Sequence, residues 1–572
     1  MAINFPAKKF KFGSEARDAM MAGIKLEREA VTATLGPNGR NVAIDRGMIV
    51  DLTKDGVTVL ADVAAEDQFA QMGCLLVREA STKTNDEAGD GTTSAIEIAW
   101  AMCEAGRKRL EEGTNVIKLQ DGMQKAMDIV VEELKKQSIE VKDRQQYVDV
   151  ATISAQDKVI GEKIADIFLA SGENGVIDIE RVDKPGIDTE HTDGMQFSQG
   201  WIRHEFINDF TNLSYSMPDV PVIVTDREIT ANPELVGLEL LARKGIKKCV
   251  IICDDCNGEA LGTIVKNAHY GAFHCCVVKA PGWGERKMEI LKDIAAMTGA
   301  TFLSEENGLS LDQITLEHIG RARQITVKQK KTTIIADRDH VVPNPTGESR
   351  TIDSLVKERV EKLKAQIDSM DESFDKEKMK ERLAAMTDGV SIVKLGANTE
   401  IERILMKRRV EDAIHAVQCA KEEGIVAGGG AALLKCCSAL EAFRLDDPDE
   451  QTGVDIVLAA IQSPAKRILE VAGVEPEPPS FFFRLSSALR KKWRSRQQDE
   501  IVQHVRSLPR ESGYDMSRKG KNYINLIEKG VVDPTKVVRT CFLNGSSCAK
   551  SFLSVEVAIT PIREEKPEPK KA

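Results

Sequence analysis

The chain has 572 residues, of which 42% are hydrophobic and 30% are charged, a balance that excludes a wholly disordered or collagen-like protein. Acidic residues outnumber basic ones by 90 to 79, and the formal net charge of -11 disfavours a general binder of polyanions. At roughly 150 residues per domain, the length predicts about three or four domains, each large enough to bury a core.

The first part of the chain is predicted to be mainly helical. Apolar residues recur at helical spacing, and the run Gly36-Pro37-Asn38-Gly39 forces a loop after the first helix. The expected helices cover 14–34, 72–83, 92–110 and 115–137, and short strands are expected at 41–45 and 57–60.

The middle of the chain changes character. Short β-like runs at 175–179, 220–224 and 248–253 alternate with helices, which predicts an α/β module. A long charged helix pair is expected over 356–386, followed by a helix over 398–423. The tail over 563–572 is charged and contains proline, so we expect it to be disordered.

The chain start and the cysteines bear on the compartment. Residues 1–11 have no long apolar core, and no stretch of roughly 18 apolar residues occurs, so neither a signal peptide nor a membrane span is expected. The 12 cysteines lack regular spacing, which is typical of reduced thiols rather than of a disulfide framework. We therefore expect a cytoplasmic protein.

Two glycine-rich loops, over 34–40 and 85–94, each lie beside a predicted helix. In the second loop, glycines permit close backbone approach, N–H groups at a helix start can face phosphate oxygens, and threonine hydroxyls add donors. Asp90 offers a hard oxygen ligand for Mg²⁺. A capped helix without any ligand explains the same residues, because Asp and Thr are good N-caps. The Walker pattern G-x-x-x-x-G-K-[ST] is absent, so this is not a standard P-loop.

Six motifs in a fixed order carry a resemblance to a known family. They are Thr34-Leu35-Gly36-Pro37, Thr53-Lys54-Asp55-Gly56-Val57, Gly89-Asp90-Gly91-Thr92-Thr93, Val410-Glu411-Asp412-Ala413, Gly428-Gly429-Gly430 and Val532-Asp533-Pro534-Thr535-Lys536-Val537. Together they closely resemble the group I chaperonins, the GroEL-type sixty-kilodalton heat-shock family, from about Lys8 to Val557. Six ordered motifs are far more specific than any one of them.

The resemblance implies a multidomain α and α/β fold with three domains. A mainly helical equatorial domain would cover 1–136 and 424–572, a hinge-like intermediate domain 137–192 and 391–423, and an α/β apical, client-binding domain 193–390. The implied function is an ATP-dependent chaperonin that folds non-native polypeptides inside a homo-oligomeric ring, with seven subunits expected per ring. ATP and Mg²⁺ are the implied cofactors, K⁺ is a further candidate, and a GroES-type co-chaperonin is a candidate partner.

The resemblance also assigns roles to single residues. Asp412 would position and polarise the attacking water, Asp55 would be a second carboxylate near that water, and Asp90 would hold the metal. The implied nucleotide-binding residues are Thr34, Leu35, Gly36, Pro37, Lys54, Asp90, Gly91, Thr92, Thr93, Ser94, Gly429, Asp515, Met516 and Asp533. Hydrolysis is mostly positioning and charge neutralisation, so a metal, a lysine and carboxylates suffice. Taken alone, Asp412 would be interpreted as part of a solvated helix face.

The implied client-binding surface departs from the family. The positions that keep an apolar side chain for capturing exposed hydrophobic chains are Trp201, Phe206, Val236, Leu261 and Val265. The positions that carry charge instead are Arg203, Glu205, Glu239 and Lys266. Two interpretations stay open: a narrower or more polar client set with altered lid docking, and neutral drift with salt bridges between these charges.

The base pocket and two insertions also depart from the family. Tyr514-Asp515-Met516-Ser517 replaces Tyr-Asn-Ala-Ala, so Asp515 keeps a hydrogen-bond acceptor and loses a donor, which leaves base preference open. A second insertion, over 336–353, is expected to be a loop.

The larger insertion covers 475–510 and contains a basic helix. Phe481, Leu485, Leu489 and Trp493 recur on one face of this helix. Such a helix suits an anionic membrane or nucleic acid, or it docks on its own domain with a solvated or acid-paired basic side. Because the apolar face is short, it does not strongly indicate that this helix binds nucleic acid or a membrane.

The cysteines of the middle segment offer a candidate metal site, and the family resemblance leaves an alternative function open. Cys253-Asp254-Asp255-Cys256 with Cys275-Cys276 would suggest zinc, but the second pair lacks C-x-x-C spacing, so a zinc site is disfavoured. The alternative function is an ATPase-impaired or specialised cage that holds clients without cycling.

Overall fold

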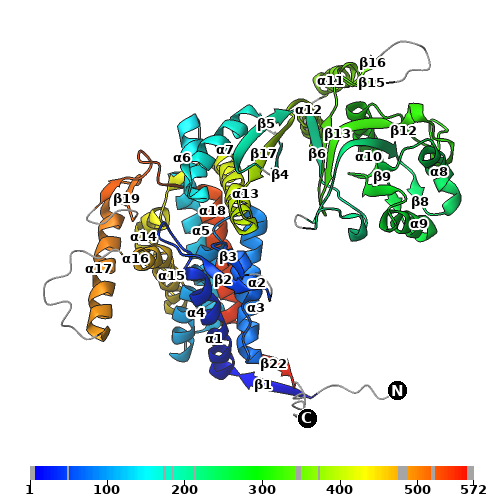
Figure 1. Ribbon diagram of the computed structural model, residues 1–572. Coiled ribbons are helices and arrows are strands. Elements are labelled where there is room, and N and C mark those ends of the chain that lie inside the picture. The colour runs from blue at the N-terminus through cyan, green and yellow to red at the C-terminus, as the bar shows by residue number, and fades with distance from the viewer. Residues whose placement is uncertain are drawn as a thin grey trace. The chain divides into compact units, whose positions relative to one another are not determined.

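Figure 1 shows the computed structural model, which describes residues 7–47, 50–171, 176–182, 184–210, 213–342, 350–370, 374–473, 487–516 and 522–562. The chain divides into two compact units. The first combines Met1–Asp166 with Ala397–Ala572, and the second is the continuous segment Ile167–Gly396. The first unit is mainly helical and the second contains a mixed sheet, so the expected multidomain α and α/β fold class is confirmed.

The first unit is a helical bundle built from both ends of the chain. Its central helices are α1 (Gly13–Thr32), α3 (Gln68–Ala88), α4 (Thr92–Glu111), α5 (Val116–Gln137), α14 (Ala431–Ala442), α15 (Pro448–Ala460) and α18 (Thr535–Leu553). The C-terminal helix α18 packs against α3 and α4 (Figure 1). Its Phe542 and Phe552 are fully buried in the core that these helices share. Burial of these large apolar side chains holds the distant segments together.

Shorter elements surround this bundle. The helices are α2 (Gly56–Asp62), α6 (Arg144–Ala155), α13 (Glu400–Glu423), α16 (Ser463–Ala472) and α17 (Ser487–Ser507), with α7 (Lys158–Ala170) crossing the division between the units. The strands form four antiparallel pairs: β1 (Lys8–Phe12) with β22 (Val557–Pro561), β2 (Val42–Asp45) with β3 (Val50–Thr53), β18 (Ile425–Ala427) with β21 (Val532–Pro534), and β19 (Ser512–Tyr514) with β20 (Tyr523–Asn525).

The second unit is organised around a seven-stranded sheet of order β11-β9-β7-β13-β14-β6, with β12 beside β7. Its strands are β6 (Gly194–Phe197), β7 (Tyr215–Thr225), β9 (Lys248–Cys253), β11 (His274–Lys279), β12 (Phe302–Leu303), β13 (Gly320–Val327) and β14 (Thr332–Ala336). β11, β9 and β7 are parallel, and the central β9 is buried along nearly its whole length. A continuous apolar run is typical of a parallel strand covered on both faces.

Helices and smaller sheets complete the second unit. The helices are α8 (Val236–Arg243), α9 (Gly258–His269), α10 (Gly284–Thr298), α11 (Ile352–Asp368) and α12 (Phe374–Thr387), with short 3₁₀ turns at His204–Phe206, Asn232–Leu235, Leu311–Gln313 and Leu316–His318. A three-stranded sheet has the order β4 (Val176–Arg181), β17 (Val390–Gly396), β5 (Gly186–Thr192). The remaining strands are the two-residue pairs β8 (Glu228–Ile229) with β10 (Asp255–Cys256) and β15 (Val341–Val342) with β16 (Arg350–Thr351).

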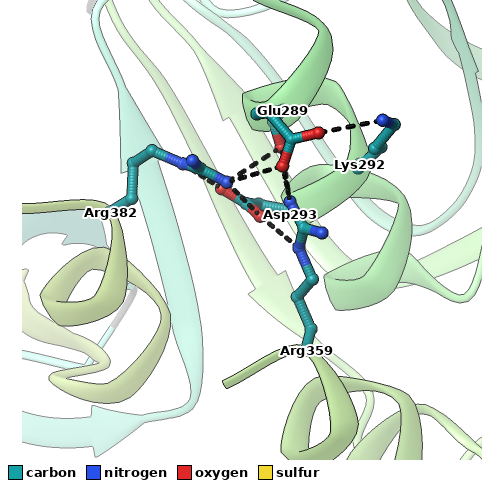
Figure 2. Close-up of polar contacts among 5 residues, drawn as sticks. All are labelled: Glu289, Lys292, Asp293, Arg359 and Arg382. Carbon is teal, nitrogen blue, oxygen red and sulfur yellow. Dashed lines mark hydrogen bonds and ion pairs between the residues drawn. The ribbon is translucent and has the colours of Figure 1, made fainter. Parts of the chain in front are cut away.

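An ion-pair cluster joins three helices of this second unit (Figure 2). Asp293 of α10 accepts hydrogen bonds from Arg359 of α11 at 2.7 Å and from Arg382 of α12 at 2.8 Å. Glu289, one turn earlier, accepts from Arg359 at 2.6 Å and from Lys292 at 2.8 Å. The buried Asp293 carboxylate and the partly buried Glu289 carboxylate therefore both meet cationic donors, and their bonds to Arg359 and Arg382 hold α11 and α12 against α10.

Two of the predicted elements are wrong. The expected strand at 57–60 lies in α2, because the Asp55 carboxylate accepts from the N–H groups of Val57 at 3.1 Å and Thr58 at 2.9 Å and so caps a helix. A short apolar run does not by itself distinguish strand from helix. The expected loop at 336–353 contains the strand pair β15–β16, and 343–349 lie outside the described residues. The other predicted helices and strands are present, with shifted ends.

All 12 cysteines are buried and not disulfide-bonded in the structure. No helix in the described ranges combines the length and apolar character needed to cross a membrane. The predicted disorder of 563–572 concerns residues outside those ranges.

Candidate functional site

Four aspartates from distant motifs lie together in the first unit. Asp55 caps α2, Asp90 lies between α3 and α4, Asp412 is on α13, and Asp533 is on β21. Asp90 interacts electrostatically with each of the other three. The fold thus brings together the carboxylates that the sequence motifs single out, and we refer to these four residues as the aspartate cluster.

The aspartate cluster concentrates negative charge that the protein leaves uncompensated. Burial raises the pKa of Asp90, Asp412 and Asp533, and the neighbouring carboxylates raise it further. The pKa of Asp533 reaches about 7 although the N–H groups of Gly429 and Gly430 donate to it. No ion pair to Asp90, Asp412 or Asp533 occurs within the described part of the chain. A cation bound here would lower these pKa values and stabilise the ionised carboxylates.

The start of α4 presents backbone N–H groups that no side chain caps. Gly89 and Gly91 adopt left-handed conformations with φ of 66° and 80°, which end α3 and begin α4 within a few residues. No side chain caps the first turn of α4, and its Thr92 and Thr93 are buried. Uncapped N–H groups at a helix N-terminus are suited to phosphate oxygens.

Two close contacts hold α2 and α13 against this loop. A Cβ at Gly56 would lie 2.7 Å from the Thr93 hydroxyl and 2.8 Å from the Thr92 hydroxyl, so a larger residue at 56 would displace both hydroxyls from their present positions. A Cβ at Gly89 would lie 2.4 Å from the Cβ of His415, so α13 passes directly over the loop. Asp412 lies one turn before His415 and is thereby brought to Asp90.

Basic side chains border the cluster on α13 and directly after β3. Arg408 bonds both oxygens of Asp51 at 3.2 Å, which fixes the strand that leads into Lys54 and Asp55. The ammonium of Lys54 donates to Oε1 of Gln156 at 2.9 Å. Burial, and then the nearby Arg409, lower the pKa of Lys54. The predicted phosphate lysine thus lies at the site without a carboxylate partner among the described residues.

The 34–37 turn follows α1 and contacts α16. The Thr34 hydroxyl donates to the Val31 carbonyl at 2.8 Å, and a Cβ at Gly36 would lie 2.7 Å from Ile468. Leu35 is half-buried and Pro37 is exposed. Ser463 at the start of α16 donates to the Glu97 carbonyl of α4, which links this turn to the phosphate-facing helix.

A small apolar pocket adjoins the aspartate cluster through Gly429, whose N–H donates to Asp533. The lining residues are Gly428, Gly429, Ala431, Leu434, Ala465, Leu469, Ile501, Val502, Val505, Tyr514 and Met516. Asp515 does not line the pocket; it is buried and its N–H donates to the Asn522 carbonyl. Of the residues predicted to bind the base, Gly429 and Met516 line this pocket, whereas Asp515 does not.

The described half of the larger insertion docks on its own unit. Ile501, Val502 and Val505 of α17 are buried in the pocket wall, and Lys435 of α14 donates to the carbonyls of Val505 and Leu508. Lys466 also pairs with Asp499 at 2.8 Å. These contacts favour the docked interpretation of this helix. Phe481 and Leu485, and the side chains of Leu489 and Trp493, lie outside what the structure describes.

The five predicted client-binding residues divide by exposure in the second unit. Val236 is 46% exposed, Phe206 is only 4% exposed, and Trp201, Leu261 and Val265 are partly buried against the core. Phe206 therefore belongs to the core in this conformation. Sequence reasoning missed Leu240, which is 44% exposed one helical turn after Val236.

Three of the four charged positions of this surface, Arg203, Glu205 and Glu239, form local ion pairs. Arg203 pairs with Glu205 at 3.0 Å, as the neutral interpretation requires, and Glu239 pairs with Arg243 at 2.6 Å. Across the described ranges, no group of three or more His, Cys, Asp or Glu side chains is arranged to hold a metal ion by itself. Mg²⁺ is commonly held by one or two carboxylates together with substrate phosphates and water, so Asp90 fits such a partial ligand set.

Comparisons with known proteins show the family and the fold of the chain. The family model described as the TCP-1/cpn60 chaperonin family matches residues 28–562. Among solved structures, the chaperonin gp146 from bacteriophage EL 2 (Pseudomonas aeruginosa), crystallised in the presence of ATP-BeFx, aligns with a TM-score of 0.66 at 18% identity. The alignment covers 97% of this chain and 99% of that one, and it shows a shared fold.

Proposed function

The chain belongs to the TCP-1/cpn60 chaperonin family, and from this premise we propose that it hydrolyses ATP with Mg²⁺ and uses that cycle to fold non-native polypeptides in a homo-oligomeric ring. The observation that carries the proposal is the aspartate cluster beside an uncapped helix start. Raised carboxylate pKa values without bonded basic partners are typical of a site whose counter-charge is a ligand.

Phosphate binding would use the groups that surround the cluster. The first-turn N–H groups of α4, the hydroxyls of Thr92 and Thr93, and the ammonium of Lys54 are donors for phosphate oxygens. The Asp90 carboxylate would hold Mg²⁺, which when bound neutralises phosphate charge. Ser94 and the 34–37 turn would complete the phosphate side, and the Gly429–Met516 pocket would receive the base.

Asp412 is proposed to act on the attacking water. Once the site is neutralised by its ligand, Asp412 can ionise and accept a hydrogen bond from a water molecule. The water oxygen would bond to the terminal phosphorus as the bond to the bridging oxygen breaks, which gives ADP and phosphate. The water proton would pass to the Asp412 carboxylate. The Asp55 carboxylate already accepts hydrogen bonds from the first turn of α2, so its role would be to fix the start of that helix and to add negative charge near the water.

The division of the chain supports the proposed three-domain scheme. The two units separate after Asp166 and after Gly396. Both points fall inside the segments proposed as the intermediate hinge, 137–192 and 391–423. The equatorial domain would then be 1–136 with 424–572, and the apical domain 193–390.

Ring assembly and client capture would use exposed apolar side chains. Phe10 and Phe12 on β1 are 52% and 61% exposed, and β1 pairs only with β22 among the described strands. An unpaired strand edge with apolar side chains is suited to pairing with another chain. In the second unit, Val236 and Leu240 of α8 form an exposed apolar step suited to hydrophobic client segments.

The test is ATP turnover by the purified chain with and without Mg²⁺, beside Asp412→Asn and the matched neighbour Glu411→Gln. The proposal predicts Mg²⁺-dependent turnover that falls by about 100-fold or more in Asp412→Asn, with nucleotide binding retained, because the lost group acts on the water. Glu411→Gln should retain turnover. Client capture with no turnover in the unmodified chain would instead support a cage that does not cycle.

A further inference from the structure

Gln156 has a backbone conformation that its residue type does not favour. It follows α6 with φ 53° and ψ 28°, in the left-handed region, and its N–H donates to the Ile153 carbonyl. Helices commonly end in this conformation, but glycine or asparagine normally occupies the position because other side chains crowd the backbone there. Among the described residues, only Leu213 and Asp219 share a positive φ without being glycine. A strained residue of this kind suggests that its side chain has a role.

The side chain of Gln156 reaches the proposed phosphate lysine. Its Oε1 accepts the hydrogen bond from Nζ of Lys54 at 2.9 Å, although 102 residues separate the two. Lys54 makes no ion pair in the described ranges, and the adjacent Asp55 is occupied in capping α2. Arg409, one turn before Asp412 on α13, is close enough to add a like charge. A neutral amide oxygen is therefore the acceptor that holds Lys54 at a site rich in charge.

We infer that Gln156 is a positioning residue that holds Lys54 in the nucleotide-free chain and releases it to a phosphate group when nucleotide binds. This inference rests on the proposed function of Lys54. An amide oxygen keeps the ammonium beside the cluster, yet a phosphate oxygen carries charge and forms the stronger hydrogen bond. Phosphate also offsets the repulsion between Lys54 and Arg409, so transfer of Lys54 from Gln156 to nucleotide is favourable.

The choice of glutamine follows from the same reasoning. A glutamate at 156 would bind Lys54 through a charge-assisted bond and would compete with phosphate. A glycine or asparagine would suit the backbone, but neither would reach Lys54 with the same length of side chain. Glutamine combines the necessary reach with a bond weak enough to exchange.

The experiment measures how fast Lys54 is modified in the intact protein. Reductive methylation with formaldehyde and cyanoborohydride is followed at Lys54 by mass spectrometry, with and without Mg²⁺ and a non-hydrolysable ATP analogue. The variants are Gln156→Gly, Gln156→Asn and Gln156→Glu. The matched control is Gln145→Ala, which removes an exposed glutamine that bonds Asp149 on the same helix. Gly and Asn both suit the backbone at 156, so folding is retained.

Without nucleotide, Lys54 should be methylated about threefold faster in Gln156→Gly and Gln156→Asn than in the unmodified chain or Gln145→Ala, and more slowly in Gln156→Glu. Analogue binding should be weakened about tenfold in Gln156→Glu. Equal methylation rates in all variants, with Lys54 still protected by the analogue, would overturn the inference and leave the proposed function intact. If the analogue protected Lys54 in no variant, the phosphate role of Lys54 would fail, and the inference with it.

Discussion

Buried carboxylates occur in both units, but their surroundings differ. In the second unit, Asp293 is 1% exposed and is bonded by Arg359 and Arg382, as Figure 2 shows. Although burial alone would raise the pKa of the neighbouring Glu289, hydrogen bonds from Lys292 and Arg359 lower it to about 2. In the first unit, Asp412 and Asp533 are close to other carboxylates instead, and their pKa values are raised.

The contrast separates a structural cluster from a ligand site. Where each buried charge has its partner, removing one member leaves the others uncompensated, and the cluster stabilises the fold only as a complete set. Where like charges lie together without partners, the ligand-free protein is destabilised, and binding of a ligand of opposite charge restores the lost stability.

Removing Asp293 should be the most destabilising change. Asp293→Ala leaves Arg359 and Arg382 partly buried without their shared carboxylate, which should cost about 3–5 kcal/mol. Hydrogen exchange of α10, α11 and α12 measures the loss. The matched control is Asp375→Ala, which removes an exposed ion pair with Arg286 and should cost less than about 1 kcal/mol. Asp412→Ala should not destabilise the first unit, and a loss equal to that of Asp293→Ala would erase the distinction.

Stability of the empty first unit should fall as pH rises, because of Asp533. The folded-state pKa of about 7 lies above the unfolded value of about 3.9, so the folded chain holds this proton more tightly. The penalty is absent below the unfolded pKa and fully present above the folded pKa. Asp533→Asn should therefore raise Tm at about pH 8 and leave it unchanged near pH 4. A Tm gain of equal size at both pH values would argue against the raised pKa.

Gly56→Ala should weaken nucleotide binding while the chain still folds. The added Cβ would meet the hydroxyls of Thr93 at 2.7 Å and Thr92 at 2.8 Å, which must rotate away from their present positions. Because both hydroxyls are proposed phosphate donors, we expect the KM for ATP to rise about tenfold. Gly262→Ala in α9 is the control, since its Cβ would meet nothing within 4 Å. An unchanged KM would remove Thr92 and Thr93 from the phosphate site.

Replacing exposed apolar side chains should change the free energy of unfolding least. The two replaced surfaces should nevertheless affect different functions, assembly in one case and client capture in the other. Replacing Phe10 and Phe12 by Ser should dissociate the assembly, and replacing Val236 and Leu240 by Ser should preserve the assembly but weaken capture of an unfolded client. Each pair should change unfolding stability by less than about 1 kcal/mol, because these side chains are exposed. Sedimentation and client-binding assays distinguish the two. Identical behaviour of both double variants would contradict separate roles for the two surfaces.

Sequence reasoning found the residues whose types are fixed by motifs and missed those that depend on backbone geometry. Asp90, Asp412 and Asp533 could be named because their motifs recur in order, and the fold brings them together. The apolar run at 57–60 favours a strand, whereas the Asp55 carboxylate caps a helix there, and an Asp-Gly pair alone does not distinguish a cap from a loop. The positive φ of Gln156 could not be predicted from the sequence, because glutamine, unlike Gly or Asn, does not indicate a left-handed backbone conformation.

Exposure was the other property that the residue types could not settle. Phe206 and Val236 are both apolar, yet Phe206 is buried in the core of the second unit, whereas Val236 is exposed on α8. Likewise, the basic insertion over 475–510 contributes three apolar residues to the wall of the pocket beside Gly429, namely Ile501, Val502 and Val505. Tertiary packing decides such cases, since a single apolar residue fits either environment.

The central claim is that the aspartate cluster binds Mg²⁺ together with ATP. Equilibrium binding of ATP to the intact chain, measured with and without Mg²⁺ and repeated on Asp90→Asn, tests it most directly. Mg²⁺ should tighten ATP binding at least about tenfold in the unmodified chain and have no such effect in Asp90→Asn. ATP binding that does not depend on Mg²⁺, or an equal Mg²⁺ effect in Asp90→Asn, would contradict joint binding of metal and nucleotide at the cluster.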